Sequence, residues 1–410
     1  MSAPIDYDIL IIGGGMVGAS LACALGNTAL RIGIIEAVPF NASAQAQPSY
    51  DDRTLALAYG SRRIFEGMGL WATLAGATTP IKKIHVSDRG HFGVTHIDCA
   101  DEGVEALGYV VVSRTLGQTL MQALHALPHV ELICPAQLTN ITTRADHAQV
   151  IVDQNGEQRT LTARLVVAAD GGKSAVREQL KIPTRTWDYH QTAIITNITP
   201  QHPHNNIAYE RFTSTGPIAM LPMSDNRCAV VWTVASDQAD TVMRLTDEAF
   251  LAGLQHAFGH RLGRLQKTGM RHAYPLVLTR ALEHVRPQLA VIGNAAHTLH
   301  PIAGQGFNLG LRDAAALAQV IVEAQRAGYD IGNLDVLNHY ADWRRADQMR
   351  AIAFTDSLVR IFTNPLAPFA LGRNLGLLAV DLLPPLKHLL ARQTMGLVGK
   401  LPRLARGLGL

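Results

Sequence analysis

The chain has 410 residues and a formal net charge of +3, from 36 Lys and Arg against 33 Asp and Glu. A hydrophobic content of 48% with 17% charged residues is typical of a globular protein and excludes general disorder, and the length predicts two or three domains. The small net charge, without a basic run interleaved with aromatic residues before the C-terminal end, predicts that nucleic acid is not a partner.

Patterns for export, disulfide bonding and metal binding are missing from the sequence. The N-terminus lacks a basic and apolar leader pattern, and no stretch of about 18 residues is free of charges and helix breakers. The four cysteines are far apart and form no C-x-x-C pair, which favours free thiols in a reducing compartment. His297 and His300 could share a helical face, but no acidic or thiol partner accompanies them, so no metal site is expected. A cytoplasmic protein is therefore predicted.

Residues 6–36 carry a strand–turn–helix–strand pattern with the spacing G-x-G-x-x-G at Gly13, Gly15 and Gly18. Gly13 allows a tight turn, Gly15 lets a pyrophosphate approach the backbone, and Gly18 lets the helix pack closely on the strand. Glu36 ends the second strand, where its carboxylate can accept hydrogen bonds from ribose hydroxyls. The complete order predicts an adenine-dinucleotide site, for either a visiting NAD or a resident FAD, over an ordinary βαβ turn.

The stretch that follows predicts an α/β pattern. Residues 37–49 are expected to form a loop and residues 54–67 a helix. Arg53, just before that helix, is either a solvated helix-start residue or a cation beside the dinucleotide site. Asn155-Gly156, between two alternating segments, predicts a hairpin. These elements predict a parallel sheet with an antiparallel excursion. Further helices are expected at 19–26 and 114–127, and strands at 9–12, 31–35, 82–88, 109–112, 130–134 and 165–169.

From residue 192 to 234 the pattern changes to short alternating segments separated by Pro, Gly and Asn. This change predicts an antiparallel sheet that forms a second domain inserted into the first. A helix is expected at 246–258. A buried strand at 289–292 then leads through a turn at 300–306 into a long amphipathic helix at 307–327.

Two later strand ends carry small and polar residues that can converge on the ligand of the glycine loop, because parallel sheets bind ligands at their carboxyl edges. The first is the segment 170–177, whose Asp170 and Ser174 could also belong to an ordinary capped helix start. The second is the segment 293–306, which could be a structural turn. Three such strand ends in one chain favour a shared ligand site.

Taken together, these motifs resemble, in order, the three fingerprints of the class A FAD-dependent aromatic hydroxylases. More narrowly, residues 300–313, HPIAGQGFNLGLRD, are similar to the signature of the ubiquinone-biosynthesis monooxygenases, as are the regions 52–54 and 209–217. Within this family the nearest similarity is to the branch that hydroxylates 2-octaprenyl-6-methoxyphenol. The resemblance covers essentially the whole chain.

The resemblance implies an α/β fold with a Rossmann-like FAD-binding domain of the glutathione-reductase type, an inserted antiparallel-sheet substrate domain and a C-terminal helical segment. The implied boundaries place the FAD-binding domain at residues 1–80, 109–182 and 289–345, the substrate domain at 81–108 and 183–288, and the helical segment at 346–410.

The implied cofactor is FAD, with NAD(P)H as a transient co-substrate because the chain has no second G-x-G-x-x-G. Pro301 would shape the wall at the flavin face, and backbone N–H groups around Gly304, Gln305 and Gly306 could stabilise negative charge on reduced flavin, so these four residues are the expected catalytic ones. The expected cofactor-binding residues are Gly13, Gly15, Gly18, Glu36, Arg53, Arg114, Asp170, Gly171, Asn294, Gly304, Gly306, Phe307 and Asn308.

Asn294 departs from the wider family, which usually has Asp there as the ligand of a ribityl hydroxyl. An amide still forms hydrogen bonds with a hydroxyl, and Asn fits the octaprenyl-methoxyphenol branch. No acid–base residue is assigned. His297 and His300 are candidates for orienting the flavin or the substrate, or are structural.

From Phe362 onward the chain is leucine-rich, and Pro384-Pro385 prevents one spanning helix. The segment is either a helical cap on the FAD-binding domain or a basic amphipathic surface for anionic lipid or a partner protein, and these two roles are compatible. In the second role, a polyprenyl tail would reach the site through it. The basic residues, against the single acid Asp381, are Arg373, Lys387, Arg392, Lys400, Arg403 and Arg406.

The resemblance thus implies a FAD-dependent monooxygenase that hydroxylates the ring of a polyprenylated phenol in ubiquinone biosynthesis with NAD(P)H and O2. Other ubiquinone-biosynthesis proteins are expected partners, and peripheral contact with the inner face of the membrane is a further expectation. The alternatives are a class A hydroxylase of a small soluble aromatic, a non-catalytic flavoprotein scaffold and a plain NAD dehydrogenase.

Overall fold

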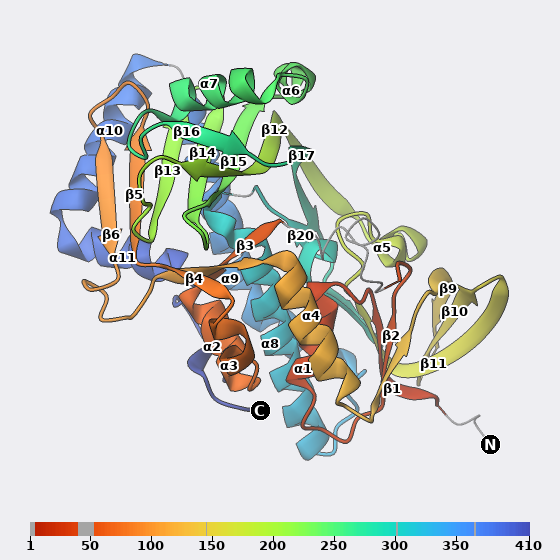
Figure 1. Cartoon of the computed structure of the whole chain (residues 1–410). Coiled ribbons are helices and arrows are strands. Elements are labelled where there is room, and N and C mark those ends of the chain that lie inside the picture. The colour runs from red at the N-terminus through yellow and green to blue at the C-terminus, as the bar shows by residue number, and fades with distance from the viewer. Residues whose placement is uncertain (1–4, 40–52, 145, 301, 365) are drawn as a thin grey trace.

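The computed structural model describes residues 5–39, 53–144, 146–300, 302–364 and 366–410. They form an eight-stranded sheet, a nine-stranded sheet and a three-stranded sheet, with helices packed around them. Figure 1 shows the two large sheets in separate halves of the molecule, with the blue C-terminal helices beside the larger sheet. The expected fold class is confirmed: an α/β protein with a parallel sheet, an antiparallel sheet and C-terminal helices.

The eight-stranded sheet is built around β1 (Tyr7–Ile12), which is buried on both faces. Ile9 and Ile11 pack into the core on one side of the sheet, and Leu10 and Ile12 into the core on the other, as in a central parallel strand. The other strands are the parallel β2 (Ile32–Ile35), β8 (Val130–Ile133), β11 (Glu157–Ala168) and β19 (Leu289–Val291), and the antiparallel β9 (Gln137–Thr143), β10 (Ala148–Gln154) and β18 (Val285–Arg286).

Helices cover both faces of this sheet. On one face, α1 (Met16–Ala24), α4 (Ser113–His125) and α8 (Gln305–Arg326) share a hydrophobic core with β1. On the other face, the β9–β10 hairpin packs with the short α5 (Ala175–Gln179). Because β1, β11 and β19 run in parallel side by side, their carboxyl ends meet at one edge. The glycine loop and the segments at Asp170 and Asn294 therefore come together there.

The nine-stranded sheet is antiparallel except where β13 pairs in parallel with β5. One face packs against α7 (Asp247–Phe258), through a core that includes Phe250, Leu254 and Trp232. Short turns η2 (Ser236–Gln238) and α6 (Ala239–Met243) precede α7. The strands are β5 (Lys83–Asp88), β6 (Val94–Asp98), β12 (Thr184–Pro200), β13 (Ile207–Thr213), β14 (Gly216–Pro222), β15 (Cys228–Ala235), β16 (Leu265–Thr268), β17 (His272–Ala281) and β20 (His297–Thr298).

The expected helix at 54–67 is wrong over its first five residues. Residues Thr54–Ala58 form β3, and only Tyr59–Gly67 form helix α2, followed by α3 (Trp71–Ala75). β3 is one of the two outer strands of a three-stranded antiparallel sheet, in which β7 (Gly108–Val112) is central and β4 (Thr78–Ile81) is the other outer strand. Pairing with β7, some fifty residues away in sequence, overrides the helical preference of a short Leu- and Ala-rich segment.

The C-terminal region forms α9 (Leu334–Thr363), α10 (Ala367–Leu382), α11 (Pro384–Thr394) and the turn η5 (Leu404–Arg406). α10 packs on the edge of the nine-stranded sheet through buried polar contacts. Asp88 Oδ2 accepts hydrogen bonds from Arg373 Nε at 2.7 Å and Asn374 Nδ2 at 3.0 Å. Arg373 is thus buried against Asp88 instead of lying on a basic surface.

No single helix among the described residues has the length and apolar composition needed to cross a membrane. Residues 368–382 and 384–394 meet that criterion only as a pair, and the two helices are bent by 97° at the break between them.

Candidate active site

The glycine loop between β1 and α1 has a geometry that only glycine can adopt at two positions. Gly13 has φ +105°, and a Cβ there would lie 2.5 Å from the carbonyl oxygen of Ala169. A Cβ on Gly18 would lie 2.0 Å from the carbonyl oxygen of Gly13. Gly15 is the N-cap of α1 and has no side chain to cap it, so the first N–H groups of the helix are available to an anion.

Glu36 lies at the end of β2, beside the glycine loop. Its Oε2 accepts a hydrogen bond from the Gly14 N–H at 2.8 Å, and its Oε1 accepts one from the Val38 N–H at 2.9 Å. Each carboxylate oxygen has a second lone pair for a ribose hydroxyl. The two backbone bonds fix the carboxylate at the position where an adenine dinucleotide presents its ribose.

Asp170 follows β11 and is held at the start of α5. Its Oδ2 accepts a hydrogen bond from the Val176 N–H at 3.1 Å, whereas Oδ1 is buried with no hydrogen-bond partner among the described residues. Burial raises the pKa of this carboxyl group. Ser174 caps α5 by accepting the Arg177 N–H at 3.1 Å, and Arg177 donates to the Ala295 carbonyl at 2.8 Å. This ties the Asp170 segment to the Asn294 segment and leaves one oxygen for a ligand.

The third strand end is the turn η3 (Gly293–Ala295) after β19. Gly293 has φ +61°, and a Cβ there would lie 3.0 Å from the Cγ1 of Val17 in α1. Gly310 of α8 packs on it, since its own Cβ would lie 3.0 Å from the Gly293 Cα. Asn294 is exposed and lines the cavity described below, so its amide can reach a cofactor.

Helix α8 begins at Gln305, and its N-cap Gly304, the last residue of the turn η4 (Ile302–Gly304), has the left-handed conformation φ 60°, ψ 27°. No side chain caps this helix start, so the partial positive charge at the N-terminus of a 22-residue helix faces the site. Gly306 has no atom within 4 Å of a built Cβ, and it lines the cavity together with Gly304. The side chain of Gln305 is buried and donates to the Thr394 carbonyl of α11 at 3.4 Å.

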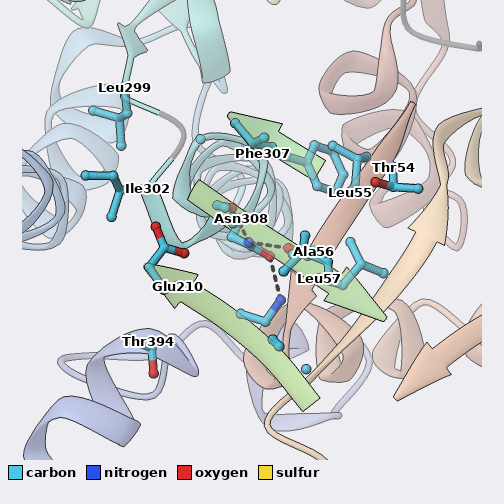
Figure 2. Close-up of a pocket in the computed structure, with 18 of the residues that line it drawn as sticks. Thr54, Leu55, Ala56, Leu57, Glu210, Leu299, Ile302, Phe307, Asn308 and Thr394 are labelled. Carbon is cyan, nitrogen blue, oxygen red and sulfur yellow. Dashed lines mark hydrogen bonds between the residues drawn. The ribbon is translucent and has the colours of Figure 1, made fainter. Parts of the chain in front are cut away.

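Asn308, an expected cofactor-binding residue, joins α8 to β3 and α2. Its Nδ2 donates to the carbonyls of Ala56 at 2.8 Å and Gly304 at 2.6 Å, and its Oδ1 accepts from the Ala58 N–H at 2.8 Å and the Ser61 hydroxyl at 2.7 Å. Figure 2 shows Asn308 beside Ala56 and Leu57 on the wall of the cavity. The side chain thus positions the start of α8.

The remaining expected residues are spread around the cavity. Arg53 lines it and donates to the Tyr274 hydroxyl at 2.9 Å, and Phe307 also lines it. Arg114 lies in the first turn of α4 and does not line the cavity. Pro301 and most of the expected loop at 37–49 lie outside the described residues.

One cavity of about 580 Å³ connects these strand ends with the nine-stranded sheet and the C-terminal helices. At one end it is lined by Gly15, Gly171 and Asn294. Towards the other end the walls are apolar and come from the sheet and from α9, α10 and α11. The cavity therefore joins a polar cofactor end to an apolar chamber.

Glu210 lines the cavity and is absent from the expected site residues. It lies on β13 between Ala208 and Phe212, which line the same cavity, so the period of two along the strand directs all three side chains inward. Its Oε1 is buried without a hydrogen-bond partner among the described residues, and burial raises the pKa of the carboxyl to about 7. An acid at an inward position of an alternating strand is the sequence signal that points to it.

Neither candidate histidine lines the cavity. His297 Nε2 pairs with Asp313 Oδ2 at 2.6 Å in a buried cluster that also contains Arg344. His300 is buried and lies 3.3 Å from Gln191 Oε1, and burial lowers its pKa to about 4, so its ring is neutral at pH 7. Over the described ranges, no group of three or more His, Cys, Asp or Glu residues could hold a metal ion.

The residues at this edge fit an adenine-dinucleotide cofactor. They combine an uncapped helix start, glycines that no other residue could replace, a fixed carboxylate at Glu36 and an orphaned oxygen on Asp170. Residues 6–355 match the model of the FAD binding domain family. The fold and the site therefore define a FAD-binding protein, as expected.

Comparison with known proteins narrows this class. Ubiquinone hydroxylase UbiL of Rhodospirillum rubrum is 41% identical over 406 residues, which cover 98% of this chain and 93% of the relative. The 3-demethoxyubiquinol 3-hydroxylase of Escherichia coli is 34% identical over 394 residues, which cover 95% of this chain and 98% of the relative. The structure of p-nitrophenol 4-monooxygenase PnpA from Pseudomonas putida superimposes with a TM-score of 0.80 at 17% identity, covering 97% of this chain and 99% of that one, and shows the same fold.

The chain belongs to the ubiquinone hydroxylase family of class A FAD-dependent monooxygenases. It is an aromatic ring hydroxylase of ubiquinone biosynthesis, with FAD as cofactor and NAD(P)H as co-substrate. The expected family, enzyme class and cofactors are confirmed.

Proposed function

We propose that the enzyme hydroxylates a polyprenylated phenol of the 2-polyprenyl-6-methoxyphenol type, with O2 as the oxygen source. The cavity carries this proposal. Its polar end lies at the start of α8 and at Asn294, and its apolar end is lined by Phe354, Leu358, Leu377 and Leu390. A phenol ring with a hydrocarbon tail matches both ends, whereas a small soluble aromatic would leave the apolar chamber without an occupant.

In this proposal the protein binds and orients the substrate and excludes water from the site. The flavin supplies the oxygen-transfer chemistry when bound. The N–H groups at the start of α8 face the site and favour negative charge there. Asn308 holds that helix start against β3, which keeps the donors in place. The apolar walls exclude water from the ring of the substrate, which suppresses side reactions of the activated oxygen.

A second candidate is hydroxylation of another ring position in the same class of substrate. The Escherichia coli relative is named for hydroxylation at position 3 of demethoxyubiquinol, and it covers 95% of this chain. Both candidates require the same cavity. They differ in the substituents on the substrate ring and in the ring carbon that is hydroxylated.

We further propose that α10 and α11 form the route of the tail and a peripheral contact with the inner face of the membrane. The inner sides of both helices line the cavity, through Leu377 and Leu390. Their outer sides expose large apolar residues near the exposed cation Arg392, a composition that binds anionic lipid surfaces. Other proteins of ubiquinone biosynthesis could dock on the same surface. The exposed apolar residues are Leu366, Phe369, Leu371, Leu375, Leu378, Leu382, Leu383, Leu386 and Leu389.

The decisive experiment is aerobic turnover of a prenylated 2-methoxyphenol with NAD(P)H and isotope-labelled O2, followed by mass spectrometry and NMR of the product. One labelled oxygen atom on the ring is the expected result, and the NMR spectrum identifies the carbon. Oxygen on the carbon that the Escherichia coli enzyme is named for would favour the second candidate. Consumption of NAD(P)H with hydrogen peroxide as the only product would reject both, and a protein that neither consumes NAD(P)H nor oxidises phenols would be a scaffold.

A further inference from the structure

Glu210 is an acidic side chain in an apolar part of the cavity. It lies on β13 opposite Ala219 of β14 and Val86 of β5, and both of these residues also line the cavity. Figure 2 shows its carboxyl group among the labelled residues that surround the cavity, including Ile302 and Asn308. The carboxyl therefore faces the cavity between the sheet and the start of α8.

The surrounding charged and titratable groups do not neutralise Glu210. Tyr209 also lines the cavity, but its ring packs against the rings of His85 and Phe258, and Arg211 donates to the Phe258 carbonyl at 2.6 Å. Arg53 lines the same cavity and has the Tyr274 hydroxyl as a partner at 2.9 Å.

No charge on α8 or α11 contributes to the ionisation of Glu210. The residues of these helices that line the cavity are Gly306, Phe307, Asn308, Leu390 and Thr394, none of which is charged. Burial alone accounts for the pKa of about 7.

Glu210 is half-buried, and its buried Oε1 has no hydrogen-bond partner among the described residues, which is costly to the fold, so an apolar residue at this position would be more stable. Such a residue is retained when a ligand supplies the missing partner. A phenolic hydroxyl is a suitable one, because it donates a hydrogen bond and has a pKa of about 10, as in tyrosine. A carboxylate whose pKa is raised towards that value is a stronger base than an ordinary one.

We propose that Glu210 is the catalytic base of the hydroxylation, which accepts the hydrogen bond of the substrate's phenolic hydroxyl and takes its proton as the ring is attacked. This proposal rests on the proposed function. The phenolic O–H bond breaks, its electron pair stays on oxygen and flows into the ring, and the proton forms an O–H bond on Glu210.

The remaining atoms balance as in any ring hydroxylation. One atom of O2 enters the ring and the other leaves as water, with two electrons from NAD(P)H. When the ring carbon that gained oxygen loses its hydrogen as a proton, Glu210 returns its own proton to the first oxygen, and the ring is aromatic again. The base is thereby regenerated in each turnover.

The test compares wild type with Glu210→Gln, which keeps the shape of the side chain and can accept a hydrogen bond but cannot take a proton. We expect unchanged FAD content, a fall in kcat of about 100-fold and a much smaller change in KM. Wild-type kcat/KM should rise with pH around 7, because only the ionised carboxyl is a base, and this rise should be absent from the variant. Glu157→Gln, in the exposed hairpin of β10 and β11, controls for the loss of one carboxylate.

A binding measurement needs no turnover. The holoenzyme without NAD(P)H is titrated with geranylated 2-methoxyphenol and with its methyl ether, which cannot donate a hydrogen bond. Above pH 7, wild type should bind the phenol about tenfold more tightly than the ether, the effect of a hydrogen bond to a charged group, and Glu210→Leu should bind both equally.

The outcomes separate the two proposals. If wild type binds the phenol selectively but inserts no oxygen, the proposed function is wrong and Glu210 is still the phenol-binding residue. If Glu210→Gln keeps the wild-type kcat and pH profile, or if Glu210→Leu keeps the preference for the phenol, the assignment of Glu210 is overturned. Glu210→Gln should unfold at a higher urea concentration than wild type at pH 8, so misfolding does not obscure the result.

Discussion

Asp313 joins α8 to α9 and to His297 of β20, and it allows a quantitative prediction. Its carboxylate is fully buried and accepts hydrogen bonds from His297 Nε2 at 2.6 Å, Arg344 Nε at 2.8 Å and Gln348 Nε2 at 3.1 Å. Removing one partner of a buried ion pair costs about 3–5 kcal/mol, because the other charge stays buried. Since Arg344 keeps a second partner, Asp347, at 2.6 Å, we expect Asp313→Ala to cost about 3 kcal/mol, at the lower end of this range.

The measurement is urea unfolding of the apoprotein. The midpoint urea concentration should shift, whereas the slope of the unfolding free energy against urea concentration should stay constant. The matched control lies on the neighbouring helix α9, which also carries Arg344. Asp342 pairs with Arg345 at 3.2 Å, but the two side chains are 69% and 71% exposed. Asp342→Ala should therefore cost less than about 1 kcal/mol. Equal costs for the two variants would refute the role of the buried cluster.

The pH dependence of the unfolding free energy provides a second test of the role of Asp313. Burial by itself would raise the pKa of Asp313, but His297 and Arg344 outweigh burial and hold it well below its usual range. The stabilisation is therefore complete above the unfolded-state pKa of about 3.9 and is lost only as the pH falls towards the lower folded-state value. The stability difference between wild type and Asp313→Ala should therefore be at least as large at pH 5 as at pH 8. A difference that vanishes near neutral pH would contradict this reasoning.

Three further predictions concern the cofactor and the C-terminal helices. Gly18→Ala would place a Cβ 2.0 Å from a backbone carbonyl oxygen, so the purified protein should lack FAD. The control Gly372→Ala, whose Cβ would have no atom within 4 Å, should retain FAD. Equal flavin absorbance in the two purified variants would disprove the close approach at Gly18. Asn294→Asp should retain FAD if hydrogen bonding is what matters there, and loss of flavin would show that a neutral amide is required. Leu382→Ser, which removes apolar area without adding a charge, should weaken binding to anionic vesicles about tenfold without loss of FAD, unlike Tyr329→Ser at the same exposure of 66%. Equal effects would exclude α10 as the lipid contact.

The parts of the fold whose conformation depends only on residues close in sequence were predictable from the sequence. The strand at β1, the glycine loop and the first turn of α1 follow from an apolar run and the spacing of three glycines. The hairpin at Asn155-Gly156 follows from a two-residue turn, and Asn155 and Gly156 both have positive φ. In each case the backbone conformation is decided within a few residues.

The wrong helix at Thr54–Ala58 shows the limit of such reasoning. A five-residue segment rich in Leu and Ala can form either structure, and its pairing with β7 decided the outcome. The role of Asn308 was likewise not predictable. Its four hydrogen bonds involve residues from three elements that only the folded chain brings together.

The sequence by itself determined the cofactor and the family, because three strand ends with glycines and acids, in this order, are local patterns that are together typical of dinucleotide-binding proteins. Only the tertiary structure decided the shape of the cavity, the isolation of Glu210 within it and the burial of Arg373 against Asp88. The physical reason is that burial, and with it the pKa of a side chain, depends on contacts between segments far apart in sequence. The glycine loop is such a local pattern, whereas packing between the sheet and the C-terminal helices creates the apolar chamber.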